Sequence, residues 1–327
     1  MLNIVMKHVD VFTTNPFGGN PAGVVTEADS LSSDLMLAIA AEMNLSETTF
    51  VTLPSTDEAL YRVRFFTPTE EMSLSGHAII ASCYALIEDG RIPLTDGVTH
   101  AAFETKAGLI QLDIHFRRGA TAPDAGGVAL AINGGDDGVL EKIMLHQAVR
   151  GHRPSNIPAQ EIAKILGLDV AEIRKTGLPL EIISTGFEQL MIPVLRKETI
   201  HGMNPDLIKL GLMNRAQGIH TNHVFAVDTY SPECVAYMRH FEPAIGMWEE
   251  PASGTAAAGL VSYLLRHGVV TSGSMIVEQG KEIDNLARIL VETADSADPT
   301  SEMKIGGLAV TSITRRIGIE NNALVVS

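Results

Sequence analysis

The sequence has little cysteine, few aromatic side chains and a shortage of positive charge. Its two cysteines, Cys83 and Cys234, permit at most one disulfide, so the chain is not a disulfide-stabilised scaffold, and Cys83 is expected to be a small core residue. Lysine and arginine number 24 against 39 acidic residues, which gives a formal net charge of −15. We therefore expect neither nucleic acid nor an anionic membrane surface as a partner, because their phosphates would be repelled.

Long apolar runs and several familiar functional motifs are absent as well. No segment approaches the length of a transmembrane helix. The first residues, MLNIVMKHVDVF, carry Lys7, His8 and Asp10 where a signal peptide needs an apolar run, so we expect a cytoplasmic protein. The glycine-rich segment GGNPAG at 18–23 matches neither a P-loop nor a dinucleotide-binding fingerprint, and no G-x-S-x-G or H-E-x-x-H motif occurs.

The composition and length are those of a globular protein with two domains. Hydrophobic residues make up 45% and charged residues 19% of 327 positions, which is long for one core and comfortable for two. Most apolar segments are short and resemble strands, and they lack the alternating strand–helix order of a doubly wound sheet, so the fold class predicted is α+β. The expected strands include 62–66, 109–116, 180–184, 190–194, 223–228, 274–279, 287–293 and 308–314.

Two similar stretches indicate an internal duplication. SGHAIIASCYALIEDG runs from Ser75 to Gly90, and SGTAAAGLVSYLLRHG runs from Ser253 to Gly268 with its matching residues at the same spacing. Each begins with a serine suited to an N-cap, ends at a glycine suited to a C′ position, and follows a pair of glutamates. The sequence therefore predicts two related domains, each with one apolar helix.

The amino ends of these helices are candidate binding sites. Free amides and partial positive charge at a helix N-terminus favour a carboxylate or a developing enolate, and glycine lets a ligand approach the backbone. Tight helix–sheet packing is the alternative explanation for the glycines. The candidate general base is Glu47, which lies in NLSETTFV (44–51) at an expected helix-to-strand junction. Partial desolvation there would raise the pKa of its carboxyl group. Taken alone, Glu47 could equally be a solvated residue of a turn.

Several motifs in their order and spacing resemble the PhzF family, named for the phenazine-biosynthesis isomerase. They are FGGNPAGVV (17–25), NLSETTFV (44–51), FFTPTEEMSLSGHAIIAS (65–82), STGFEQLMIPV (184–194), EEPASGTAAAGL (249–260) and EQG (278–280).

The resemblance implies the diaminopimelate-epimerase fold and a domain arrangement. In that fold two pseudo-symmetric domains each wrap a sheet or barrel around a central helix, the site lies between them, and the protein is usually a homodimer. A polar, glycine-rich stretch at 115–127 predicts the linker. With the last strand returning to the first domain, the expected domains are 1–118 plus 312–327, and 119–311.

The resemblance also implies a reaction and its residues. The family's isomerase moves a proton between two carbons of trans-2,3-dihydro-3-hydroxyanthranilate without metal or organic cofactor, so no cofactor is expected and the substrate is a small carboxylate. Glu47 takes the place of its general acid/base. The expected catalytic residues are Glu47, His77 and Glu250, and the expected substrate-binding residues are Asn20, Ser75, Gly76, Ser253, Gly254 and Thr255.

Three departures from the family pattern leave the substrate open. Epimerases and racemases of this fold place cysteine where Ser75 and Ser253 stand, and serine is a poor base without an activating partner. Glu250 replaces an aspartate and Thr255 a serine, and one methylene can change discrimination by roughly 1–3 kcal/mol. An epimerase with non-cysteine bases, or a non-catalytic binding protein of the same fold, are the alternatives to the isomerase.

Two further features receive weaker interpretations. His220 and His223 in HTNH suggest a metal site, but the sequence offers no convincing third ligand. Trp248, the one tryptophan, is expected either to form an apolar wall of the site or to lie in the core.

Overall fold

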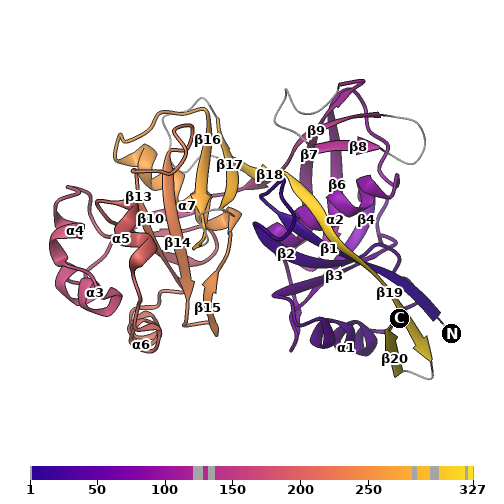
Figure 1. Cartoon of the computed structure of the whole chain (residues 1–327), viewed down its shortest axis with the longest axis horizontal. Helices are drawn as coiled ribbons and strands as arrows, with labels where there is room; N and C mark the ends of the chain where they lie inside the picture. The colour runs from indigo at the N-terminus through magenta and orange to yellow at the C-terminus, as the bar shows by residue number, and fades with distance from the viewer. Residues whose placement is uncertain are drawn as a thin grey trace. The chain divides into compact units, whose positions relative to one another are not determined.

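The chain forms two compact units in the computed structural model (Figure 1). Residues 2–120, 128–131, 137–281, 286–294, 302–320 and 323–326 are described. The first unit comprises Met1–His146 with Gly306–Ser327, and the second comprises Gln147–Ile305. Each unit is described by itself.

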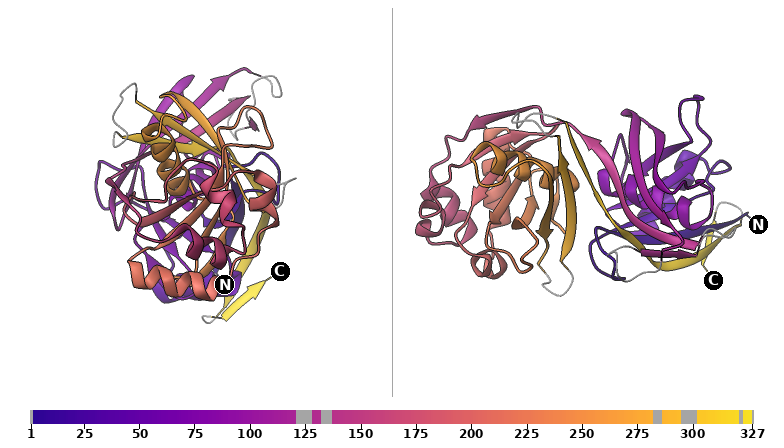
Figure 2. Two further views of the ribbon diagram at one scale, coloured as in Figure 1. Left: turned by 90° about the vertical axis from the view of Figure 1, so that its left-hand side faces the viewer. Right: turned by 90° about the horizontal axis from the view of Figure 1, so that it is seen from above.

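The first unit extends beyond the boundary expected at residue 118. Strand β9 (Asp137–Gln147) pairs antiparallel with β7 (Gly108–Arg118), and this pairing keeps the chain in the first unit up to His146. Of the expected linker at 115–127, the first residues belong to β7, and 121–127 lie outside the described residues. The predicted return of the last strand is confirmed, because β19 (Ala309–Glu320) pairs along β1 (Leu2–Val11) (Figures 1 and 2).

The sheet of the first unit curves around one helix. Its strands pair in the order β20–β19–β1–β2–β3–β4–β6–β7–β9–β8, and only the β2/β3 and β4/β6 pairs are parallel among these described strands. The short β5 pairs with β4. The remaining elements are β2 (Asn20–Val25), α1 (Ser33–Met43), β3 (Glu47–Thr52), β4 (Tyr61–Phe66), β5 (Glu71–Met72), α2 (Gly76–Glu88), β6 (Gly97–Thr105), β8 (Val128–Ala131) and β20 (Ala323–Val326).

Helix α2 is the core of the first unit because it is apolar on every side. All residues from His77 to Ile87 are buried, and the helix contacts β1, β2, β3 and β19. A helix without a polar face cannot lie on a surface, so the sheet closes around it. Each buried isoleucine or leucine on α2 contributes roughly 1.5–3 kcal/mol relative to an exposed position. Cys83 lies among them and is buried as predicted.

The second unit repeats this architecture. Its strands pair in the order β10–β11–β12–β13–β14–β16–β17, with β15 on β14, and α7 packs against β11, β12 and β17. Its elements are β10 (Gly151–Pro154), α3 (Ala159–Leu166), α4 (Val170–Arg174), β11 (Glu181–Ser184), β12 (Glu188–Pro193), α5 (Lys197–Gly202), α6 (Leu207–Gln217), β13 (Thr221–Ala226), β14 (Ala236–Glu242), β15 (Met247–Glu250), α7 (Gly254–Arg266), β16 (Ser274–Gln279) and β17 (Ala287–Thr293). Strand β18 (Met303–Gly307) begins in this unit and enters the first unit at Gly306.

The predicted duplication extends to individual contacts. In both units the strand that precedes the short strand carries an arginine paired with a glutamate on the short strand. Arg64 Nε lies 2.8 Å from Glu71 Oε1, and Arg239 Nε lies 2.7 Å from Glu249 Oε1. Each guanidinium also covers the phenylalanine two residues further along its strand, at 5.2 Å and 5.1 Å from the ring centroid. Such shared details fix which positions of the two units correspond.

No helix among the described residues is both long and apolar enough to cross a membrane.

Candidate active site

Glu47 opens strand β3 in the interior of the first unit. Helix α1 ends at Met43, and its C-cap Asn44, with a left-handed backbone (φ 51°), turns the chain toward the strand that begins three residues later at Glu47. Glu47 pairs with Ala22 of β2, and its side chain, which faces His77 of α2, is only 6% exposed. Glu47 is therefore a buried carboxylate, and the alternative of a solvated turn residue is excluded.

His77 supplies the partner of this carboxylate. It is the second residue of α2, is 4% exposed, and places its Nε2 3.2 Å from Glu47 Oε2. On the other side of the ring, Nδ1 lies 3.4 Å from Ser75 Oγ. The three side chains thus form a chain from hydroxyl to imidazole to carboxylate inside one unit.

The pKa of Glu47 differs from the sequence-based expectation. Burial acts to raise it, but the charge of His77, its contact with the carboxylate and the side chain of Ser46 outweigh burial, so the pKa lies below its ordinary value of 4.5. The expected rise was wrong because desolvation alone was considered, whereas the fold places an imidazole against the carboxylate. Glu47 is therefore ionised at neutral pH and ready to accept a proton.

A buried hydroxyl network holds α2 in place above β3. The Ser82 hydroxyl lies 2.8 Å from Thr49 Oγ1 and 2.9 Å from the Ala78 carbonyl, either of which can accept its single proton, and Thr49 donates to the Gly23 carbonyl at 3.2 Å. Thr49 lies two residues after Glu47 on the same strand face, so the network fixes the helix beside the carboxylate. These hydrogen bonds explain polar residues in an otherwise apolar core.

The other predicted residues of the first unit lie at the start of α2 or of β2. Ser75 is the N-cap residue of α2, but its side chain makes no capping hydrogen bond and instead contacts His77, so the predicted cap is wrong here. Gly76 is the first helical residue. Asn20 begins β2 opposite Val11 and is 1% exposed. The structure brings Glu47, His77 and Ser75 together by direct contacts.

Replacing His77 by Asn tests this interpretation of the dyad. We expect the pKa of Glu47 to rise, because burial remains while the imidazole is removed. The stabilisation from ionised Glu47 is present above its ordinary value of 4.5 and is lost as the pH falls through the lowered native value, so the variant should lose stability at a higher pH. Carbon NMR of the Glu47 carboxyl measures the change. His100→Asn, at a surface imidazole that pairs with Asp113, is the control, and equal Glu47 titrations in all three proteins contradict the interpretation.

In the second unit, α7 begins as predicted from the sequence. Ser253 caps the helix by accepting from the Ala256 amide at 3.4 Å. Gly254 is the first helical residue, and Thr255 Oγ1 donates to Gln147 Oε1 at 3.4 Å. The predicted residues of this helix start therefore lie side by side.

Gln279 joins Glu250 to this helix start. It is fully buried, donates to the Glu250 carbonyl at 2.8 Å and accepts from the Ser253 amide at 2.9 Å. One side chain thus spans the loop between β15 and α7. The sequence contained the signal in the EQG motif, but nothing in one sequence reveals which backbone groups the glutamine bridges.

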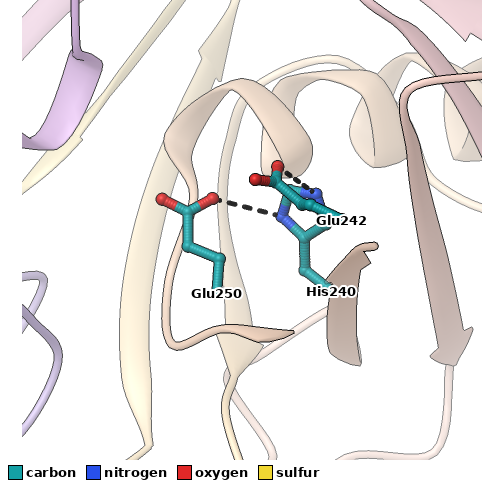
Figure 3. A group of neighbouring side chains, drawn as sticks. All are labelled: His240, Glu242 and Glu250. Atoms are coloured by element: carbon teal, nitrogen blue, oxygen red, sulfur yellow. Dashed lines mark ion pairs between the residues drawn. The ribbon is translucent and has the colours of Figure 1, made fainter. Parts of the chain in front are cut away.

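Glu250 meets two residues that the sequence analysis did not select, His240 and Glu242. The carboxylates approach opposite nitrogens of the imidazole, with Glu242 Oε1 2.8 Å from Nε2 and Glu250 Oε2 3.5 Å from Nδ1 (Figure 3). Among the described residues, this group satisfies the distance condition for a shared metal ion, with donor atoms within 4.8 Å of one another. The contacts that these three side chains make with one another are ion pairs at the two distances given. The geometry is that of an ion-pair network.

The weaker sequence candidates are resolved by their surroundings. His220 Nδ1 accepts from the Glu188 amide at 3.1 Å, and His223 is buried with its Nε2 3.1 Å from Thr221 Oγ1. The two histidines therefore serve separate contacts and do not form the suggested metal pair. Trp248 is 58% exposed, so it does not lie in the core of its unit.

Comparison with known proteins agrees with this fold. Residues 9–315 match the family described as Phenazine biosynthesis-like protein, PhzC-PhzF. The chain is 31% identical over 316 residues to "Uncharacterized isomerase YfhB" of Bacillus subtilis, covering 96% of this chain and 98% of that protein. A PhzF family protein of Bacillus anthracis superposes with a TM-score of 0.81 at 28% identity, covering 98% and 100% of the two chains. A hydroxyproline epimerase from Agrobacterium vitis shares the fold at a TM-score of 0.57 and 12% identity, covering 96% and 92%.

Two related units, each built around one buried helix, form an epimerase-like fold. Curated relatives about 30% identical over nearly the whole chain are named isomerases, so the class of protein is an isomerase. The chain belongs to the PhzC-PhzF family of phenazine biosynthesis-like proteins.

Proposed function

We propose that this isomerase shifts a proton between two carbons of a small carboxylate substrate, with Glu47 as the general acid/base. The observation that carries the proposal is the buried Glu47 carboxylate, ionised against His77 at 3.2 Å in a chain of this family. Buried, paired carboxylates with a shifted pKa are frequent at catalytic sites. In the family that the sequence resembles, the glutamate at this position of the motif is the general acid/base.

The reaction needs no change in composition and no redox partner. The Glu47 carboxylate takes a proton from a carbon next to a conjugated system, and the electron pair left behind moves into that system. The resulting carboxylic acid then returns the proton to a second carbon, so the product is an isomer of the substrate. A pKa below the ordinary value makes protonated Glu47 a strong acid for the second step. His77 stabilises the carboxylate between turnovers.

The substrate that the resemblance favours is trans-2,3-dihydro-3-hydroxyanthranilate or a related carboxylate. Each helix amino end, with Gly76 in α2 and with Gly254 and Thr255 in α7, offers contacts for an anionic or polar group of the substrate, because helix N-termini favour anions. Relative to the family pattern, Glu250 is one methylene longer and Thr255 adds a methyl group, so a related substrate is supported equally well. We further propose that the protein is a cytoplasmic homodimer that needs no cofactor. Its net charge of −15 opposes binding to nucleic acid and to anionic membranes.

Turnover assays separate this function from the alternatives. Chelator-treated protein is incubated with the dihydro-hydroxyanthranilate and with a panel of chiral amino and hydroxy acids, and products are identified by absorbance, chiral chromatography and mass. We expect a double-bond isomer and no inverted stereocentre. Inversion of an amino acid would favour the epimerase with non-cysteine bases, and binding without turnover would favour the non-catalytic protein.

A further inference from the structure

The group formed by His240, Glu242 and Glu250 is specific to the second unit (Figure 3). The repeated arginine–glutamate contacts fix which positions of the two units correspond. The first unit holds three uncharged residues at the equivalent positions, Phe65, Thr67 and Met72. The shared fold therefore forms without ionisable side chains at this place, and their presence in the second unit calls for an explanation other than folding.

Two paired strands position the three side chains. His240 and Glu242 stand two residues apart on β14, and Glu250 of β15 lies opposite His240. The register of the two strands shifts between His240 and Glu242. Such irregularities are frequent beside functional sites, because they redirect side chains. Side chains that project from strands are also held more precisely than side chains on loops, as a ligand site requires.

The donor atoms of this group are close together and largely withdrawn from water. One donor atom of each residue lies within 4.8 Å of the donor atoms of the other two. His240 is 2% exposed, and its two ring nitrogens are buried beside the carboxylates without a hydrogen bond among the described residues. Buried ring nitrogens without a hydrogen bond are rare in native proteins and point to a ligand. A cation bound between the three side chains would give the ring a partner and would be neutralised by the two carboxylates.

The composition of the group selects the class of cation. Imidazole suits zinc and other first-row transition metals, and zinc also accepts glutamate oxygens. One histidine with two glutamates resembles the zinc sites that have three protein ligands and an open fourth position. Metal–ligand distances of about 2.0–2.2 Å place the ligand atoms about 3–4 Å from one another. Small side-chain rotations are therefore enough to bring these donors to one ion, with no movement of the strands.

We propose that His240, Glu242 and Glu250 form a binding site for one divalent transition-metal ion of the zinc class. Gln279 joins Glu250 to the start of α7, so the ion would lie beside a helix end that the proposed function assigns to substrate. The ion takes up the carboxylate of Glu250, which belongs to the proposed catalytic set, and therefore inhibits turnover. This inhibitory role rests on the proposed function, whereas the metal site itself does not.

Zinc binding in the absence of substrate tests the site itself. Chelator-treated protein is titrated with zinc chloride by calorimetry, and an anomalous diffraction map of zinc-soaked crystals locates the ion. We expect one ion within about 2.0–2.2 Å of one donor atom from each of the three residues. His240→Phe, which introduces the first unit's residue, and Glu242→Gln should each weaken zinc binding by about 100-fold or more. Even the loss of a residue that only supports a metal ligand costs about 10–100-fold.

His100→Asn is the matched control, because it removes an imidazole that contacts a carboxylate outside the group. It should leave the zinc affinity unchanged within about two- to threefold, as for an innocuous surface substitution. Circular dichroism verifies that each variant is folded. Zinc located only at other histidines, or bound with equal affinity by the wild type and by a folded His240→Phe or Glu242→Gln, overturns the proposal.

Turnover in the presence of zinc tests the inhibitory role separately. With an accepted substrate, the zinc concentration that halves the wild-type rate should equal the dissociation constant from calorimetry. In Glu242→Gln this concentration should rise by about 100-fold or more, in step with the lost affinity. Zinc that occupies the site without slowing turnover overturns the inhibitory role. A wild type that turns over no substrate contradicts the proposed function alone, since the calorimetry and the diffraction map still decide the metal site.

Discussion

Glu47→Gln should reduce turnover by about 10²–10⁴-fold, the usual contribution of a general acid/base. Glutamine keeps the size and polarity of the side chain but can neither accept nor return the migrating proton. Ligand affinity should change only a few-fold, because the carboxylate is assigned to proton transfer. Steady-state rates with an accepted substrate, together with calorimetric titration of the product, measure both quantities.

Glu70→Gln is the matched control for this experiment. Glu70 is an exposed glutamate of the same unit, and its change should leave turnover within two- to threefold, roughly the scatter of an innocuous surface substitution. If Glu47→Gln retains wild-type turnover while remaining folded, another group performs the proton transfer. If it loses ligand binding together with turnover, Glu47 contributes to binding.

The second large effect concerns stability of the second unit. Arg239→Met should lower the free energy of unfolding by about 3–5 kcal/mol, the cost of breaking a buried ion pair by removing one partner. The guanidinium is 3% exposed and binds both oxygens of Glu249 at 2.7 Å. It also donates to the carbonyls of Ile200 and Met203, both at 3.1 Å, which would lose this partner. Urea unfolding followed by circular dichroism measures the loss.

The repeated pair in the first unit supplies the comparison. Arg64 is more exposed, at 18% of its side chain, and Glu71 keeps a second partner in Lys106 Nζ at 2.8 Å. Arg64→Met should therefore cost less, about 1–2 kcal/mol. Equal losses for the two variants would show that burial and the extra carbonyl contacts do not distinguish these arginines.

The sequence predicts the framework of each unit well. The helix starts at Gly76 and Gly254 follow from their serine-led motifs, and the expected strand at 274–279 coincides with β16. These elements are predictable because apolar periodicity and local caps act over few residues. The first unit's extent is not, because it depends on β9 returning to β7, a pairing between two separate segments of the chain.

The candidate site was likewise predictable from the sequence only in part. A motif identifies Glu47 and His77, but the direction of the Glu47 pKa shift follows from a contact of 3.2 Å between a strand and a helix. His240 and Glu242 carry no motif and appear in the sequence as ordinary strand residues. They gain significance only through the register that places His240 opposite Glu250.

The two units also show how a duplicated contact diverges. In the first, Lys7 on β1 pairs with Glu88 and Asp89 at the end of α2, at 2.7 Å and 2.5 Å. In the second, Glu181 on β11 pairs with Arg266 and His267 at the end of α7, at 3.1 Å and 2.7 Å. The strand and the helix have exchanged charges while the contact persists. Both units thus keep opposite charges at this contact, although the residues that carry them differ.

The central claim is that Glu47 carries a proton from one carbon to another, and solvent labelling tests it most directly. Wild type and Glu47→Gln are incubated with an accepted substrate in deuterium oxide, and mass spectrometry with NMR locates deuterium in the product. The account predicts that the wild type forms the isomer, with deuterium at the receiving carbon in proportion to exchange of the Glu47 proton with solvent, and that the variant forms it about 10²–10⁴-fold more slowly. Product formed equally by Glu47→Gln, or deuterium only at an inverted stereocentre, would contradict it.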